Sequence, residues 1–364
     1  MIDEVYKYFA GKRVLVTGHT GFKGSWLSIW LLQMGADVIG FARAPKTLND
    51  NFVLAALDKK MLSVIGDIRN AELLRKIIND EKPEIVFHLA AQPLVLESYA
   101  NPIETFETNI MGTAYLVQAC SDSSHVKDII VITTDKVYEN KSWDYGYREI
   151  DRLGGYDPYS SSKAAAELVV ASLRNSFLNP RDFSIHGKSL ATVRAGNVVG
   201  GGDWSENRII PDCIRALENN KSIQLRNPYS TRPWQFVLEP LWGYLILASK
   251  MHSDPEIFAS AWNFGPRYIN AIPVITLVDK LVQKYGNGTW HESTSSSRPH
   301  EASFLSLDIA KAEKYLQWRP ILTCDKMIDF VVDWYKSYKN ESVYEICTRQ
   351  IESFMEIWKS RQEN

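Results

Sequence analysis

Residues 13–24 read RVLVTGHTGFKG, and this stretch decides the fold of the first half of the chain. A short β-branched run ends at Gly18, and residues 22–35, FKGSWLSIWLLQMG, continue with helical spacing to a closing glycine. Glycines at 18, 21 and 24 permit a tight strand-to-helix turn and let backbone N–H groups approach a pyrophosphate. The helix N-terminus favours the same anion. The stretch predicts a dinucleotide-binding turn; the alternative is a glycine-rich turn without a ligand.

Apolar runs with the character of strands alternate with helical segments up to about residue 200. The strand-like runs are DVIGFAR (37–43), LSVIGDI (62–68), EIVFHLA (84–90), DIIVITT (128–134) and LATVRAGNVVG (190–200). Helices are expected near 70–80, over 101–120 and from the segment that contains Tyr159. This alternation predicts an α/β fold, a doubly wound parallel sheet covered on both faces.

The alternation of strands and helices ends at about Val199, after which loops rich in Gly, Pro, Ser and Arg separate helices of moderate length. We therefore expect residues 1–200 to form a dinucleotide-binding domain. Residues 201–364 are expected to form mainly a smaller, mixed α/β substrate-binding lobe, with some interleaving of the chain between the two.

Bulk properties exclude several classes of function. The 364 residues carry a net charge of −2 without a Lys/Arg-rich run, which argues against a nucleic-acid partner. The longest apolar runs fall far short of the ~20 residues of a membrane span, and the N-terminus lacks the apolar core of a signal peptide. The cysteines are widely spaced, which predicts reduced thiols in a cytoplasmic protein and no metal site. They are Cys120, Cys213, Cys324 and Cys347.

Tyr159 and Lys163 stand four residues apart in GGYDPYSSSKAAAELVV (154–170), so a helix places them on one face. A free tyrosine, with a pKa of about 10, is a poor base, and a neighbouring cation favours its phenolate. The pair therefore predicts a proton-transfer site with a lowered Tyr159 pKa. An exposed Tyr beside a solvated Lys is the alternative.

The second strand ends at Arg43 instead of at a carboxylate that would bind the adenosine ribose. Arg43 suits a 2′-phosphate or stacking on adenine, so the choice between NAD and NADP stays open here. Asp67 and Ile68, at the end of the third strand, are expected at the adenine edge; Asp67 as a helix cap is the alternative.

Several motifs together resemble the extended short-chain dehydrogenase/reductase family, with its Rossmann-like sheet. TGHTGFKG, HLAAQ, the N-x-x-G-T of 109–113 and the Tyr159/Lys163 pair occur in the family's order. TTDKVYEN, RAGNVVGGGDW, RNPYSTRPWQFVLEPL and RPHE are similar to the nucleotide-sugar 4,6-dehydratases within it, and most of all to those that act on CDP-glucose. The resemblance covers essentially the whole chain.

The resemblance implies an internal redox reaction with tightly bound NAD that is regenerated in each turnover. CDP-glucose would be oxidised at carbon 4, lose water across carbons 5 and 6, and be reduced at carbon 6, giving CDP-4-keto-6-deoxyglucose. Tyr159 would take the proton of the 4-hydroxyl, Lys163 would bind the nicotinamide ribose, and Thr134 would bind the 4-oxygen. Asp135 and Lys136 would be the acid and the base of the elimination, and which is which stays open.

The remaining contacts are expected as follows. The cofactor would be bound by Gly18, Thr20, Gly21, Phe22, Lys23, Gly24, Arg43, Asp67, Ile68, Leu89, Ala90, Ala91, Thr108, Tyr159 and Lys163. The substrate would be bound by Gln92, Asn197, Arg208, Arg232, Arg298 and His300. Arg forks suit a diphosphate, which is why three arginines from separate loops are included. Trp204 and Trp234 are expected either at the pocket or in the core.

Three other functions remain open. A dTDP- or GDP-sugar dehydratase would use the same chemistry, and a nucleotide-sugar 4-epimerase would share Tyr159 and Lys163 but has no use for both Asp135 and Lys136. A non-catalytic scaffold that senses dinucleotides would not need the Tyr/Lys pair. The family further implies a homodimer or tetramer, built on the 101–120 and Tyr159 helices, and a deoxysugar product for a surface polysaccharide such as lipopolysaccharide.

Overall fold

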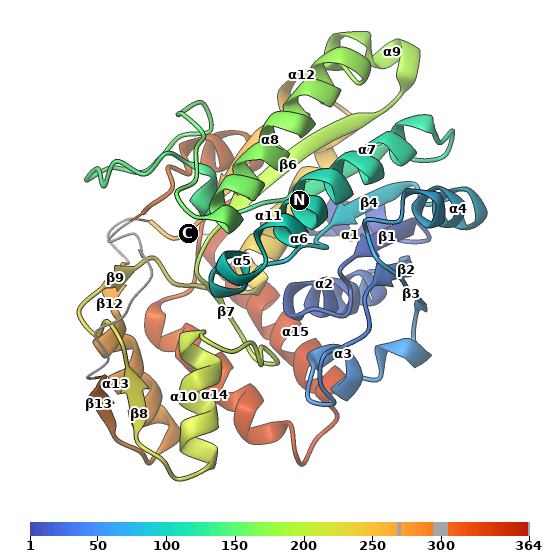
Figure 1. Cartoon of the computed structure of the whole chain (residues 1–364). Coiled ribbons are helices and arrows are strands. Elements are labelled where there is room, and N and C mark those ends of the chain that lie inside the picture. The colour runs from blue at the N-terminus through green and yellow to red at the C-terminus, as the bar shows by residue number, and fades with distance from the viewer. Residues whose placement is uncertain (268–270, 294–304, 363–364) are drawn as a thin grey trace.

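A seven-stranded parallel sheet forms the centre of the computed structural model, which describes residues 1–267, 271–293 and 305–362 (Figure 1). The strand order is β11-β6-β5-β4-β1-β2-β3. The strands are β1 (Arg13–Thr17), β2 (Asp37–Ala42), β3 (Leu62–Ile65), β4 (Ile85–His88), β5 (Asp128–Ile132), β6 (Ser189–Ala195) and β11 (Ala261–Phe264). Neighbouring strands all pair in parallel, so their carboxyl ends share one edge of the sheet. The predicted α/β fold is confirmed.

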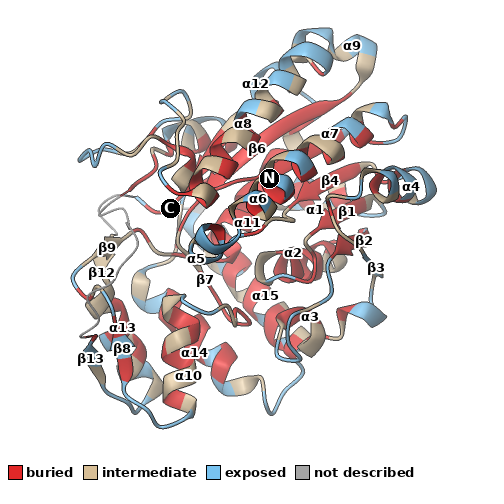
Figure 2. Cartoon of the chain, in the orientation of Figure 1, coloured by how far each residue is buried: buried red, intermediate tan, exposed pale blue. Residues whose placement is uncertain are grey.

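Alternate residues of the inner strands β1, β2, β4, β5 and β6 face two separate cores. On β1, Leu15 belongs to one core, while Val14 and Val16 belong to the other. The first core is covered by α4 (Ala71–Glu81), α7 (Gly112–Asp122) and α8 (Pro158–Phe177). The second is covered by α1 (Ile2–Phe9), α2 (Phe22–Gln33), α11 (Leu238–Met251) and α15 (Val343–Gln362). Figure 2 shows the inner strands buried between these layers, as expected for a parallel sheet, whereas the edge strand β3 is partly exposed.

The smaller lobe lies beyond the carboxyl edge of the sheet, at the lower left of Figure 1. Its helices are α10 (Ile209–Glu218), α13 (Val274–Tyr285) and α14 (Cys324–Ser337). Three two-stranded ladders join it: β7 (Val198–Val199) with β10 (Gln235–Phe236), β8 (Ile223–Leu225) with β13 (Trp290–Glu292), and β9 (Thr231–Arg232) with β12 (Ile272–Pro273). The boundary after residue 200 stays a prediction, and α11, β11 and α15, which follow it, lie in the sheet layers.

One segment differs from its sequence-based prediction. The single helix expected over 101–120 is divided into α6 (Pro102–Phe106), a π-helical turn over Glu107–Met111, and α7. The extra residue of a π turn rotates the side chains that follow, and such turns often occur at functional sites. Here the turn buries Thr108 and Asn109 beside the loop that follows β4.

Each helix among the described residues is too short or too polar to cross a lipid bilayer.

Candidate active site

The glycine turn between β1 and α2 lies directly against the loop after β4. Gly18 has a φ of +76°, and a Cβ placed on it would lie 2.7 Å from the backbone nitrogen of Ala90. A Cβ on Gly24 would overlap the carbonyl oxygen of Gly18. Helix α2 begins after Gly21, and no side chain caps it. Its first backbone N–H groups face the carboxyl edge of the sheet and therefore have no side-chain acceptor there. This cradle fits the pyrophosphate of a dinucleotide.

The charged residues expected at the adenosine end are paired with neighbouring side chains. Arg43 pairs with Glu104 at 3.2 Å, and its carbonyl accepts a hydrogen bond of 2.9 Å from the hydroxyl of Thr20. Asp67 accepts hydrogen bonds from the backbone and the guanidinium of Arg69, and these lower the pKa of its carboxyl. Asp67 therefore does not cap α4, whose cap is Asn70.

The loop after β4 is locked to the π turn. The backbone N–H of Gln92 donates to Asn109 at 2.8 Å, and Asn109 donates to the Gln92 carbonyl and to Ser162 of α8. The side-chain amide of Gln92 donates to the Leu94 carbonyl and to Thr105. Gln92 thus shapes its own loop, and both of its amide hydrogens are used there. Leu89, Ala90 and Ala91 lie in this loop, beside the glycine turn.

Tyr159 and Lys163 lie buried on the first turns of α8, which is capped by the carboxylate of Asp157. Tyr159 faces the hydroxyl of Thr134, and Thr134 donates to Asp135 at 2.9 Å. The ammonium of Lys163 donates to the carbonyl of Ile132, the last residue of β5, at 3.1 Å. The structure therefore joins the Tyr/Lys helix to the strand end that carries the predicted acid.

The pKa of Tyr159 differs in direction from the sequence-based prediction. Burial raises it to about 12 and outweighs the opposing hydrogen bond of Thr134. Burial, and after it the nearby Lys23, lower the pKa of Lys163 to about 8. The two pKa values therefore move apart, because burial disfavours both the phenolate and the ammonium, and a bound ligand or cofactor must help to stabilise the charged forms.

A glycine makes room for the carboxylate of Asp135. Gly196 follows β6, and a Cβ on it would overlap this carboxylate. Lys136 is half-buried in the same short turn, and its backbone N–H donates to the Thr134 hydroxyl at 3.4 Å. Asn197, directly after Gly196, has a φ of +45°, and its carbonyl accepts a hydrogen bond from Gln235.

Lys23 is directed to the reaction centre, although the sequence places it in the cofactor loop. Its pKa is lowered to about 8 by burial and then by Arg208, against the opposing charge of Asp135, so both side chains lie near its ammonium. Arg208 donates to Asp203 at 2.9 Å and lowers the pKa of Tyr159. Cations from the glycine loop and from the smaller lobe thus meet at the predicted acid.

The model of the GDP-mannose 4,6 dehydratase family matches residues 15–331, which span the sheet, the Tyr/Lys pair and most of the smaller lobe. The chain belongs to this family. The CDP-glucose 4,6-dehydratase of Salmonella typhimurium is 48% identical over 98% of this chain and 99% of its own length. A dTDP-D-glucose 4,6-dehydratase of Dictyostelium discoideum is 32% identical over 66% of this chain and 56% of its own.

Solved structures share the fold of this dehydratase-family chain at lower identity. The Streptomyces venezuelae dTDP-glucose 4,6-dehydratase DesIV, with NAD and TYD bound, has a TM-score of 0.76 at 24% identity and covers 89% of this chain and 97% of its own. The Thermotoga maritima UDP-glucose 4-epimerase, with UDP-glucose, has a TM-score of 0.75 at 20% identity and covers 90% and 100%. Dehydratases and epimerases thus share the fold, so the side chains must decide between them.

Other residues predicted for the site of this family member stay predictions. Arg298 and His300 fall outside the described residues. Ile68 packs against Gly112, and Arg232 lies on β9 of the smaller lobe. Trp204 packs edge-on against Tyr335, which is the core alternative.

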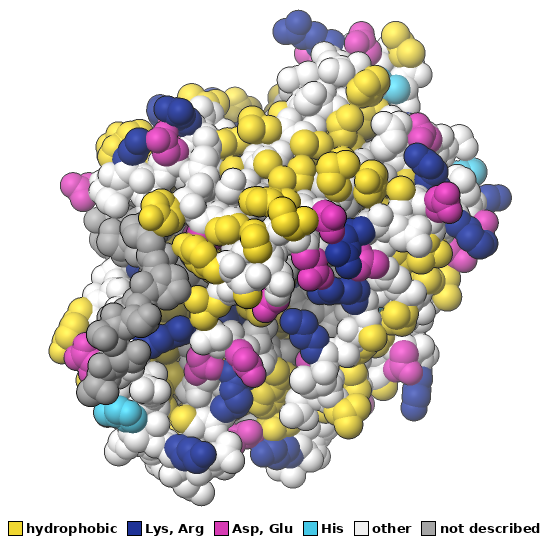
Figure 3. All heavy atoms as spheres, in the orientation of Figure 1, with side chains coloured by type: hydrophobic (Ala, Val, Ile, Leu, Met, Phe, Trp, Pro, Cys, Tyr) yellow, Lys and Arg dark blue, Asp and Glu magenta, His cyan; other side chains and the backbone are white. Residues whose placement is uncertain are grey.

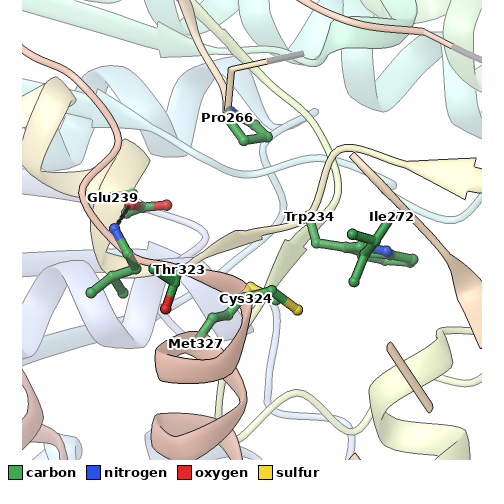
Figure 4. A pocket seen from close by; sticks show the side chains of 8 residues that line it. Trp234, Glu239, Pro266, Ile272, Thr323, Cys324 and Met327 are labelled. Carbon is green, nitrogen blue, oxygen red and sulfur yellow. Dashed lines mark hydrogen bonds between the residues drawn. The ribbon is translucent and has the colours of Figure 1, made fainter. Parts of the chain in front are cut away.

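Trp234 lines a small cavity of the smaller lobe (Figure 4). Glu239 faces this cavity, and its carboxylate accepts hydrogen bonds from the backbone of Ile321 and Leu322 at 2.8 and 2.9 Å. Cys324 and Met327, from the start of α14, line the other side. The cavity combines one buried carboxylate with apolar walls, and it contains none of the predicted catalytic residues.

Sequence reasoning assigned no role to Gly196, Asn109 or Glu167. Gly196 stood in the quoted RAGNV, but its purpose depends on Asp135, which is distant in sequence. Asn109 stood in N-x-x-G-T, where its buried amide was not foreseen as the link between two loops and α8. The signal for Glu167 was its helical spacing of four from Lys163 and eight from Tyr159.

Proposed function

We propose that this chain converts CDP-glucose to CDP-4-keto-6-deoxyglucose and water. The connected chain of Tyr159, Thr134 and Asp135 carries the proposal, because it joins an oxidation site to a second acid that simple epimerisation does not need. The full-length likeness to a curated CDP-glucose 4,6-dehydratase supports the choice of the nucleotide. The product would serve the synthesis of deoxysugars for surface polysaccharides.

NAD is the proposed cofactor. When bound, it would supply a reversible acceptor that takes a hydride from carbon 4 and returns it to carbon 6. The cradle of Gly18, Gly21 and Gly24 would hold its pyrophosphate, with Leu89, Ala90, Ala91 and Thr108 beside it. Arg43 is paired with Glu104, which adds a negative charge where NADP carries a 2′-phosphate. That charge favours NAD over NADP.

The side chains divide the proton transfers between two halves of the site. Tyr159 would take the proton from the 4-hydroxyl, while Thr134 donates a hydrogen bond to the 4-oxygen. The resulting ketone acidifies the hydrogen at carbon 5, which Lys136 in its neutral form would remove. Asp135 would give its proton to the 6-hydroxyl, so that water leaves, and Lys136 would return its proton to carbon 5. Lys163 in its charged form would bind the nicotinamide ribose and stabilise the phenolate.

The cations around Asp135 suit the diphosphate of the substrate. Arg208 and Lys23 approach the reaction centre from different lobes, and Asn197 lies at the carboxyl end of β6. Arg208 would bind the diphosphate with its planar fork, and Lys23 would add a point charge. Arg232, Arg298, His300 and the Gln92 loop are proposed as further substrate contacts.

A homodimer is proposed through an exposed apolar surface. Figure 3 shows apolar side chains gathered over α5 (Val95–Ala100), α6, the π turn and α8. Its largest exposed members are Leu96, Tyr99, Ile103, Met111, Leu168 and Phe177. Extended apolar patches of this kind mark association sites, and two copies of these helices would cover each other.

We further propose a cytoplasmic location, since all four cysteines are free thiols.

Isotope labelling tests the proposed reaction. CDP-glucose deuterated at carbon 4 should give a product that has lost water and carries the label at carbon 6. A label that stays at carbon 4 of an epimerised, undehydrated sugar would overturn the dehydratase assignment in favour of an epimerase. Parallel assays with dTDP-, UDP- and GDP-glucose test the nucleotide, and equal turnover of all four would contradict the CDP preference.

A further inference from the structure

A buried ion pair lies directly behind the Tyr/Lys pair. The side chains of Glu167 on α8 and Arg194 on β6 are each 3% exposed. Arg194 donates to Glu167 through Nε at 3.0 Å and through Nη2 at 2.8 Å, a bidentate geometry. The hydroxyls of Thr133 and Thr192 donate to the same carboxylate at 2.6 and 2.8 Å. Every lone-pair direction expected of this carboxylate is thus engaged.

The pair connects three elements at the carboxyl edge of the sheet. Glu167 follows Lys163 by one helical turn, and Thr133 directly precedes Thr134, so the carboxylate joins α8 to the strand end that carries the predicted acid. Arg194 lies two residues before Gly196, which makes room for the same acid. A shift of the ion pair therefore moves both halves of the site.

The hydrogen-bond network continues away from the site, and its polar groups have partners there as well. The remaining guanidinium nitrogen of Arg194, Nη1, donates to the hydroxyl of Tyr138 at 2.7 Å and to the Glu149 carbonyl at 3.1 Å. Tyr138 donates to Asn263 of β11 at 2.8 Å. A buried, fully satisfied polar network of this kind fixes one arrangement of its elements.

We propose that Glu167 and Arg194 are positioning residues of this enzyme: their ion pair sets Tyr159 and Lys163 against Thr134, and Glu167, one helical turn from Lys163, supplies the negative charge beside its ammonium. The inference rests on the proposed function only for its kinetic readout, because the geometry is that of the protein alone.

The charges that face Lys163 support the second part of the inference. Burial and then Lys23 of α2 lower the pKa of Lys163, and Glu167 raises it, with a net value of about 8. His88, at the end of β4, is neutral, since burial and then Lys163 lower its pKa to about 3. Glu167 is thus the negative charge that offsets burial and Lys23.

The carboxylate itself stays ionised. Burial alone would raise the pKa of Glu167, but Arg194 and the two threonine hydroxyls together hold it below its usual value. Arg174, packed on the other side, faces both members of the pair and has its own pKa lowered by burial. Both ions of the pair therefore remain charged over the working range of pH.

Two substitutions separate charge from position. Glu167→Gln removes the charge and keeps the size, while Arg194→Lys keeps the charge of the pair and removes the fork. We expect each to lower kcat by about 10- to 100-fold, as for a misplacement of about 1 Å. Only Glu167→Gln should also shift the alkaline limb of the kcat profile, by about one pH unit towards lower pH, because Lys163 then loses its proton earlier.

A binding measurement gives a readout without turnover. The affinity for NAD can be followed by tryptophan fluorescence as the pH is raised. In Glu167→Gln the loss of affinity should begin at a lower pH than in the wild type and in Arg194→Lys. Glu239→Gln is the matched control, since Glu239 is also a buried carboxylate but lies at the cavity of the smaller lobe. The control should leave both pH profiles in place.

Three results would overturn the inference. The first is a folded Glu167→Gln protein with wild-type kcat and an unmoved alkaline limb. The second is the same loss in Glu239→Gln, which would indicate a general effect of removing a buried carboxylate. If Glu167→Gln does not fold, Arg194→Lys decides, and a wild-type kcat there contradicts the positioning role. A failure of the proposed function would be recognised separately, because the wild-type protein itself would then not dehydrate CDP-glucose.

Discussion

Gly196→Ala should separate elimination from oxidation. The new methyl group would overlap the carboxylate of Asp135, so this side chain must move by about 1 Å and lose its hydrogen bond from Thr134. A misplacement of about 1 Å costs on the order of 100-fold in rate, which corresponds to about 2.7 kcal/mol of activation free energy. The three atoms nearest to the added methyl group all belong to Asp135, so oxidation at carbon 4, which is assigned to Tyr159, should be much less affected than loss of water.

Gly265→Ala is a suitable control for this experiment. Gly265 follows β11 as Gly196 follows β6, and the preceding residues Phe264 and Ala195 are paired in register. A Cβ on Gly265 would meet Leu307 at 3.5 Å, which is an ordinary contact. Single-turnover cofactor absorbance measures the oxidation, and mass spectrometry of the sugar nucleotide measures the loss of water. Equal rates of elimination in the two variants would refute the assignment of Asp135 as the acid.

Three further predictions concern single side chains. Tyr159→Phe should abolish turnover with unchanged NAD binding by fluorescence titration, and full activity would contradict its role as base. Lys23→Met should raise the KM for CDP-glucose about tenfold, because one charge-assisted contact of about 1.5 kcal/mol is lost. The same variant should be inhibited more weakly by CDP. An unchanged KM would place the Lys23 ammonium away from the diphosphate. Burial raises the pKa of Asp128, which accepts a hydrogen bond from Tyr8, to about 7 from 3.8. This acid therefore contributes stability at low pH that is lost as the pH rises towards 7. In Asp128→Asn the decline in Tm between pH 4 and 7 should be smaller, and an identical decline would contradict the shift.

The sheet was predictable because its signals are local. Each strand of the first half is a short apolar run, and the glycines at 18, 21 and 24 lie within one turn of chain. The Tyr159/Lys163 pair needs only the helical period. The π turn at 107–111 was not predictable in this way, because ETNIM has ordinary helical spacing and the insertion depends on the Asn109 amide binding a loop 17 residues earlier.

The pKa of Tyr159 shows a second limit of local reasoning. A lysine one turn away suggested a lowered value, yet burial by distant parts of the chain dominates and raises it. Lys23 is a similar case, since its place in the glycine loop suggested the cofactor, whereas Arg208 and Asp135 lie near its ammonium. Both outcomes depend on what the fold places around a side chain, which spacing along the sequence does not contain.

The charges of the site argue for a ligand with several negative charges. Lys23 lowers the pKa of Lys163, and Arg208 lowers the pKa of Lys23, so these cations repel one another inside the protein. Asp203 balances the charge of Arg208 in an ion pair, and the carboxylate of Asp135 raises the pKa of Lys23. A diphosphate bound among them would relieve the repulsion, raise the pKa of both lysines, and hold Lys163 in the charged form that the oxidation requires. The same arrangement that recognises the substrate would thereby prepare the proton-transfer pair for the reaction.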